Sequence, residues 1–93
     1  MNRIDKKLKK MGFEKEYENK YGACFYRKNE KYSYVQNLEI NHKRSGNHLI
    51  NSYQKDLNNE GFNNSVGLTY KEAKLAMKKY KQLSRKYKWG KQG

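Results

Sequence analysis

The sequence predicts an α+β domain in which a short N-terminal helix and a long C-terminal helix lie on one face of a four- to five-stranded antiparallel meander. Apolar residues recur at helical spacing near both ends of the chain, and polar and apolar residues alternate between them. Clusters of Gly, Asn and charged residues interrupt that alternation. At 93 residues the chain has room for one small core, so we assign residues 1–89 to a single domain and 90–93 to a frayed tail.

The first predicted element is a short amphipathic helix. Ile4, Leu8 and Met11 recur at i, i+4 and i+7, which places them on one face, and Gly12 supplies a helix-ending residue. A helix of this length is marginal by itself in water. We therefore expect it to form by packing this apolar face onto the sheet.

The central segment predicts antiparallel strands joined by turns. Residues 13–21 and 23–28 flank Gly22 and form a first hairpin, and the alternation over 31–42 is typical of a half-buried strand. Residues 43–47 have turn composition and lead to a partner strand at 48–56. A second turn at 58–61 precedes a short strand at 62–66.

The last predicted element is a helix that begins at Tyr70. Thr69 and Glu72 have the spacing of a capping box, in which each side chain bonds the backbone of the other. Leu75 falls outside the expected core-facing arc and is predicted to be an exposed apolar spot. That arc of about 120° contains seven residues: Ala73, Ala76, Met77, Tyr80, Leu83, Ser84 and Tyr87.

Charge is the most informative property of the composition. The chain holds 22 Lys and Arg against 9 Asp and Glu, a formal net charge of +13. Residues 1–12 carry +4 and residues 69–93 carry +8, whereas the long centre carries +1. The two predicted helices therefore deliver the positive charge, which favours a polyanionic partner.

Five cations of the last helix form a ridge, one per turn, within an arc of about 80° on the side away from the predicted core. Like charges at these spacings repel, so the ridge is more plausible if a partner neutralises it. A solvated Lys-rich surface is the competing interpretation. The ridge comprises Lys71, Lys74, Lys78, Lys81 and Arg85, and we expect Lys6, Lys10, Lys43, Arg44 and His48 to assist it.

Motifs for catalysis or cofactor binding are weak. The sequence contains no phosphate-binding Gly-rich loop, and Cys24 stands in no motif that marks a nucleophile. His42 and His48 flank a five-residue loop and can face each other, but a structural zinc normally needs four ligands. We expect no enzyme activity, no metal site and no cofactor.

Three glutamates alternate along the first predicted strand. Glu14, Glu16 and Glu18 would share one face, without the Asp/His pattern of metal-dependent nucleases. We expect them to be counter-charges for Lys20 or Arg27.

The sequence also predicts location. The longest unbroken apolar run is residues 23–26, far shorter than the roughly 20 residues of a membrane span. Residues 1–7 lack the apolar stretch of a secretory signal, and a single Cys agrees with a reducing compartment. We therefore expect a cytoplasmic protein without membrane association.

The second half of the chain partly resembles a double-stranded RNA-binding domain. Residues 67–77 are similar to the Gly-x-Ser-Lys-Lys-x-Ala-Lys pattern that opens the last helix of that family, and residues 46–48 stand near its Gly- and His-containing loop. The resemblance implies that Lys71 and Lys74 contact phosphates and that His48 faces a groove. The family prefers Lys at the position of Tyr70, and this chain needs an additional hairpin.

Across its whole length the chain resembles small orphan proteins of phages and prophages in low-GC Gram-positive bacteria. The shared pattern is a short helix, a Tyr- and Asn-rich meander, and Leu-Thr-x-x-Glu-Ala opening a Lys-rich helix that ends near Trp, here residues 68–73 and Trp89. Inhibitors of host defence, including anti-CRISPR proteins, belong to that group. The resemblance implies binding rather than turnover, in the cytoplasm of a host cell.

Two functions remain open at this point. The first is a small basic non-enzymatic protein that binds nucleic acid, DNA or RNA, or a nucleic-acid-loaded protein complex through the ridge. The alternative is a phage counter-defence inhibitor of the anti-CRISPR type that docks on a host nuclease.

Overall fold

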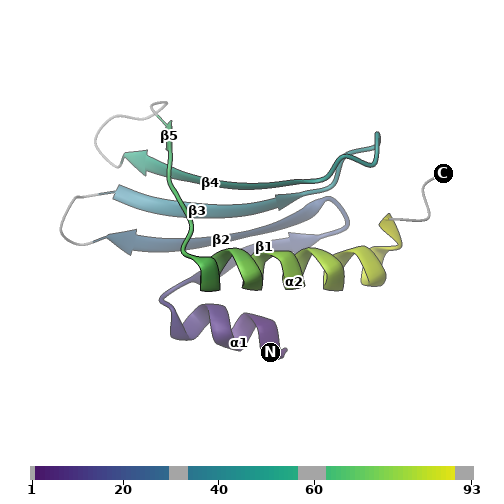
Figure 1. Ribbon diagram of the computed structural model, residues 1–93, viewed down its shortest axis with the longest axis horizontal. Helices are drawn as coiled ribbons and strands as arrows, with labels where there is room; N and C mark the ends of the chain where they lie inside the picture. Colours follow the sequence, from purple (N-terminus) through teal and green to yellow (C-terminus); the bar gives the residue numbers. More distant parts are fainter. Residues whose placement is uncertain (1, 30–33, 57–62, 90–93) are drawn as a thin grey trace.

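The computed structural model describes residues 2–29, 34–56 and 63–89. Within them the chain forms two helices and one five-stranded sheet, with the helices together on one face (Figure 1). This confirms the predicted fold class. The predicted turn at 58–61 and tail at 90–93 lie outside the described residues, as do positions 31–33 and 62 of two predicted strands. The elements are α1 (Arg3–Lys10), β1 (Glu14–Asn19), β2 (Gly22–Asn29), β3 (Tyr34–Asn41), β4 (Leu49–Asp56), β5 (Asn63–Ser65) and α2 (Tyr70–Tyr87).

The sheet is an antiparallel meander with strand order β1-β2-β3-β4-β5. Phe25 of β2 pairs with Leu38 of β3, and Ala23 pairs with Ile40, so these four buried side chains form the face beneath the helices. Alternate residues such as Cys24 point to the opposite face, because successive side chains of a strand point to opposite sides of the sheet. Each central strand therefore contributes to two different surfaces.

Gly22 allows β1 and β2 to meet in a tight hairpin. Its φ of +146° lies where side chains are rarely found, and a Cβ atom there would collide with the carbonyl oxygen of Ile40 on the neighbouring strand. Glycine is required at this position for two independent reasons.

The helices lie side by side (Figure 1). The face that each helix buries contains both apolar and charged residues. As predicted, α2 starts at Tyr70 with a complete capping box: the Thr69 hydroxyl accepts from the Glu72 backbone N–H at 3.1 Å, and Glu72 Oε1 accepts from the Thr69 N–H at 2.9 Å. Leu8 of α1 and Phe13 just after it are fully buried in the same core.

The predicted core stripe of α2 was partly wrong. Leu75, expected on the surface, is 6% exposed, whereas Met77, expected in the core, is 54% exposed. The helix is rotated because its inward face also holds Glu72 and Lys79, which an apolar periodicity cannot register. Five residues of α2 are buried: Glu72, Leu75, Ala76, Lys79 and Leu83.

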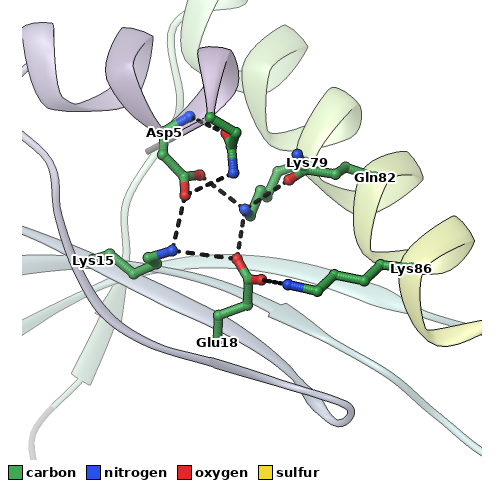
Figure 2. A network of polar contacts seen from close by, with 7 residues as sticks. Asp5, Lys15, Glu18, Lys79, Gln82 and Lys86 are labelled. Atoms are coloured by element: carbon green, nitrogen blue, oxygen red, sulfur yellow. Dashed lines mark hydrogen bonds and ion pairs between the residues drawn. The ribbon is translucent and has the colours of Figure 1, made fainter.

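A network of charges joins α1, β1 and α2 (Figure 2). The Lys79 ammonium is fully buried, 2.8 Å from Oδ1 of Asp5 and 2.6 Å from Oε1 of Glu18. Lys15 binds the same two carboxylates, and Lys86 binds Glu18 at 2.9 Å. Because the partners come from three elements, the network fixes both helices relative to the sheet.

The three glutamates of β1 do not share a face. A β-bulge between Lys15 and Tyr17 shifts the register, so Glu18 points under the helices, whereas Glu16 reaches the open side of the sheet. The predicted partners were also wrong, because Glu18 pairs with three lysines of the network and Arg27 pairs with Glu72 at 2.8 Å. A bulge inverts the alternation on which the prediction depended.

Candidate functional site

The five cations of the predicted ridge are all exposed along the outer side of α2. From Lys71 to Arg85 the ridge spans about 21 Å at the rise of an α-helix. Within the described residues, none of the five forms an ion pair with a carboxylate. Their charges are therefore available to an external anion.

A groove runs between α1 and α2, and cations stand on both of its sides. Lys7 and Lys10 come from α1, facing Lys71, Lys74 and Lys78 of α2, around a cavity of about 330 Å³. The floor is apolar and consists of Met11 and Leu75. We call this surface the helix groove.

The helix groove continues along α2. A second hollow of about 450 Å³ lies between Ile4 of α1 and the C-terminal half of α2, where Lys78, Lys81 and Arg85 line it. Lys78 lines both hollows, so the cations form one continuous track. In neither hollow does a described carboxylate contribute to the lining.

The absence of carboxylates from the groove follows from where they are placed. Asp5, Glu18 and Glu72 are turned toward the interior, where they neutralise buried or sheet-facing cations. Burial alone would raise the pKa of Glu18, but hydrogen bonds from Lys79 and Lys86 and the nearby positive charges lower it to about 2. Glu18 is therefore ionised at neutral pH and bound to internal lysines.

Lys7 is a groove residue that the sequence prediction missed. It lies three positions after Ile4 and four before Met11, so it shares their side of α1. That spacing was the available signal. Of the two predicted α1 residues, Lys10 lines the groove, whereas Lys6 is exposed elsewhere on the helix.

The structure does not bring the other predicted residues to the groove. Lys43 and Arg44 are exposed in the turn between β3 and β4, and His48 packs beside the C-terminal half of α2, with its ring 5.5 Å from that of Tyr80. Lys71 and Lys74 lie at the opposite end of that helix. The candidate site therefore contains the ridge, Lys7 and Lys10, without the turn cations.

His48 belongs to an aromatic cluster. Nδ1 of His42 lies 3.2 Å from Nδ1 of His48, which also accepts the Lys43 backbone N–H, and this second bond assigns the donor role to His42. The ring of buried Trp89 stacks on His42 at 5.0 Å, and its Nε1 donates to the Lys20 carbonyl at 2.9 Å. Burial, and then the charge of His42, lowers the pKa of His48. Trp89 thus closes the edge of the core.

Within the described part of the chain, the groups to consider for a catalytic or metal site are Cys24 and clusters of His, Cys, Asp and Glu side chains. Cys24 is buried, and burial, followed by the nearby Glu16, raises the pKa of its thiol to about 12, which favours the poorly nucleophilic thiol form at neutral pH. Among the described residues, no three His, Cys, Asp or Glu side chains are grouped to hold a metal ion.

Compared with known proteins, the chain matches no family model, no curated protein and no solved structure at a significant level. Neither helix of the described residues is long and apolar enough to cross a membrane. The helix groove is therefore the feature of the described residues that bears most directly on function.

Proposed function

We propose that this protein is a small, non-enzymatic nucleic-acid-binding protein that holds phosphates in the helix groove. The observation that carries the proposal is the continuous track of cations along α2, faced by Lys7 and Lys10 of α1 in the first hollow, with no carboxylate among the described lining residues. A Lys-rich surface that is only solvated does not require the nearby carboxylates to point away from it. In contrast, each unpaired cation that contacts a phosphate of a polyanion releases a counterion condensed on it, and this release favours binding.

The length of the track is appropriate for a nucleic-acid backbone. Phosphates of one strand of a duplex are separated by about 3.4 Å along the axis, so about 21 Å of ridge spans roughly six of them. Lysine is a flexible point charge without the planar fork that reads base edges. We expect binding that depends strongly on salt and weakly on sequence.

The salt dependence of affinity tests this proposal. If the ridge neutralises five phosphates, log K against log salt falls with a slope of about −4.5 on duplex DNA. Replacing Lys74, Lys78 and Lys81 by Gln should flatten the slope by nearly three units, because three phosphate contacts are lost. Fluorescence anisotropy between about 50 and 200 mM salt gives both slopes.

A matched control uses the cations that the structure places away from the groove. The double variant Lys43→Gln, Arg44→Gln keeps the slope of the parent protein if the groove is the contact surface. A slope that is unchanged in the triple variant, or that falls mainly in the turn variant, would refute the groove as the phosphate site. Urea denaturation of each variant verifies that the fold persists.

One observation favours the alternative, an inhibitor that docks on a host nuclease. The groove floor of Met11 and Leu75 is apolar, and Met77 is exposed beside the ridge. An acidic protein surface with an apolar side chain at its centre would use both features. Pull-down from host lysate with and without nuclease treatment separates the two functions, because only a protein partner is retained after nucleic acid is destroyed.

A further inference from the structure

The open face of the sheet carries a second concave surface. Both helices lie on the other face, and a basin of about 790 Å³ is formed by side chains of β1, β2, β3 and β4. Its floor contains Cys24 and Asn37, both buried, although neither α1 nor α2 covers this side of the sheet. We call it the sheet basin.

Three tyrosines line the sheet basin, and two of them, Tyr26 and Tyr53, flank Asn37. Asn37 of β3 pairs with Tyr26 of β2 on one side and with Tyr53 of β4 on the other. The backbones of the two tyrosines are therefore about 10 Å apart, two strand spacings, with the amide of Asn37 between them. A planar aromatic group of a ligand would stack between two rings at such a spacing, since aromatic pairs have centroids about 4.5–7 Å apart. Base–aromatic stacking is the recurrent way in which proteins hold unpaired nucleobases.

The two ends of the sheet basin carry opposite charges. Two residues along the strands in one direction, Val35 pairs with both Lys28 and Lys55, which are exposed on either side of it. In the other direction lies Glu39, with Glu16 on the rim near it. The acidic and basic ends are separated by four residues of β3, about 13 Å.

This polarity selects the occupant. The phosphates of a strand would lie at the lysine end, where two cations flank the slot and can contact the phosphates before and after one nucleotide. The base would then present its hydrogen-bonding edge to Glu39. An ionised carboxylate only accepts hydrogen bonds, so it favours an edge made of donors. Guanine alone among the common bases has two adjacent donors, N1–H and the N2 amino group, on that edge.

We propose that the sheet basin binds an unpaired guanosine of a single-stranded nucleic acid, with the base between Tyr26 and Tyr53 and its N1 and N2 donors on Glu39. Lys28 and Lys55 contact the flanking phosphates. The inference shares with the proposed function only the class of ligand, because it uses the opposite side of the sheet from the helix groove. Burial, and then the neighbouring Glu39 carboxylate, raise the pKa of the Tyr53 phenol.

The test uses fluorescein-labelled single-stranded hexanucleotides in a background where Lys74, Lys78 and Lys81 are replaced by Gln. That background separates the two sites. One probe has a single guanine among thymines, one has inosine at that position, which lacks the N2 amino group, and one contains only thymine. We expect the guanine probe to bind about tenfold more tightly than the thymine probe, with inosine in between.

Three further substitutions assign the roles. Glu39→Gln should remove most of the preference for guanine while retaining the general affinity, and Tyr26→Ala should weaken all probes about tenfold through lost stacking. Lys28→Gln should weaken all probes alike and reduce the salt slope by about 0.7. Lys9→Gln, on the exposed side of α1, is the matched control and should change nothing.

Several outcomes overturn the inference. Equal affinity for the three probes, or a guanine preference that survives Glu39→Gln, removes the proposed recognition. Amide chemical shifts that move on the helices and not around Asn37 place the strand elsewhere. Concentration-dependent self-association that Tyr26→Ala abolishes would assign the face to a second copy of the chain. A salt slope flattened in the groove variant, together with a guanine preference retained in it, would support both sites, whereas either result alone would support one.

Discussion

At the scale of single residues, Lys79 shows how one buried positive charge connects α2 to two other elements. Its ammonium is inaccessible to solvent and contacts Asp5 and Glu18 from two other elements. Removing one partner of a buried ion pair leaves the remaining charge desolvated, which costs more than the pair contributes. Lys79 is therefore a buried structural lysine of α2, whereas the ridge lysines of the same helix are exposed.

Replacement of Lys79 tests this division. Lys79→Met fills similar space but leaves two carboxylates under the helices with fewer partners, so we expect a loss of about 3 kcal/mol of unfolding free energy. Lys78→Met, the exposed neighbour, should change it by less than about 0.5 kcal/mol. Urea denaturation followed by circular dichroism measures both. Similar losses for the two variants would contradict the assigned roles.

The same network predicts a dependence of stability on pH. Asp5 and Glu18 have folded-state pKa values below their ordinary values, because the surrounding lysines outweigh the effect of burial. Their contribution is fully present above the unfolded pKa of about 4 and is lost as pH falls toward the folded pKa, about 2 for Glu18. Urea midpoints measured at pH 7, 4, 3 and 2 should therefore fall steeply below pH 4. Glu18→Gln should be less stable at pH 7 and show a shallower decline, and an equally steep decline would exclude Glu18 as a source.

At the scale of elements, the start of α2 is set by reciprocal hydrogen bonds between Thr69 and Glu72. Glu72 also binds Arg27 of β2 at 2.8 Å, so the cap connects the helix to the sheet as well as ending it. The position of the ridge depends on this connection, because rotation of α2 would carry the lysines away from α1.

Removal of the Thr69 hydroxyl tests the cap. Thr69→Ala should lower the unfolding free energy by about 1 kcal/mol, because the Glu72 backbone N–H loses its acceptor. Thr69→Ser retains an oxygen at that place and should recover most of the loss. Denaturant titrations compare the three proteins, and a serine variant as unstable as the alanine variant would show that the methyl group rather than the hydroxyl matters.

At the scale of the whole molecule, positive charge is separated from its counter-charges. Asp5 and Glu72 are buried and the Glu18 side chain is turned inward, whereas the helix groove retains an excess of cations that repel one another. Such self-repulsion destabilises a compact state until salt or a partner screens it. The internal ion pairs are less affected by salt because they are partly or fully buried.

Thermal unfolding at increasing salt measures this repulsion. Raising NaCl from about 10 to 200 mM should increase the Tm by about 4 °C. The five ridge cations form four successive like-charge pairs, and each pair lowers stability by a few tenths of a kcal/mol until salt screens it. The variant with Lys74, Lys78 and Lys81 replaced by Gln should show a clearly smaller increase. A decrease in Tm with salt would mean that screening of favourable ion pairs dominates instead.

The sequence by itself determined the order of helices and strands, the capping box at Thr69 and the exposed ridge from Lys71 to Arg85. These features depend on local rules, namely helical periodicity, strand alternation and hydrogen bonds between residues close in the chain. The segregation of charge toward the two ends was likewise a matter of counting along the chain.

Only the tertiary structure decided which side chains meet. Burial of Lys79 depends on Asp5 and Glu18, which are far from α2 in sequence, and a β-bulge turned Glu18 inward against the local alternation. Lys7 joined the groove because α1 packs beside α2. Each of these outcomes depends on pairing energies between distant segments, and no periodicity within one segment contains that information.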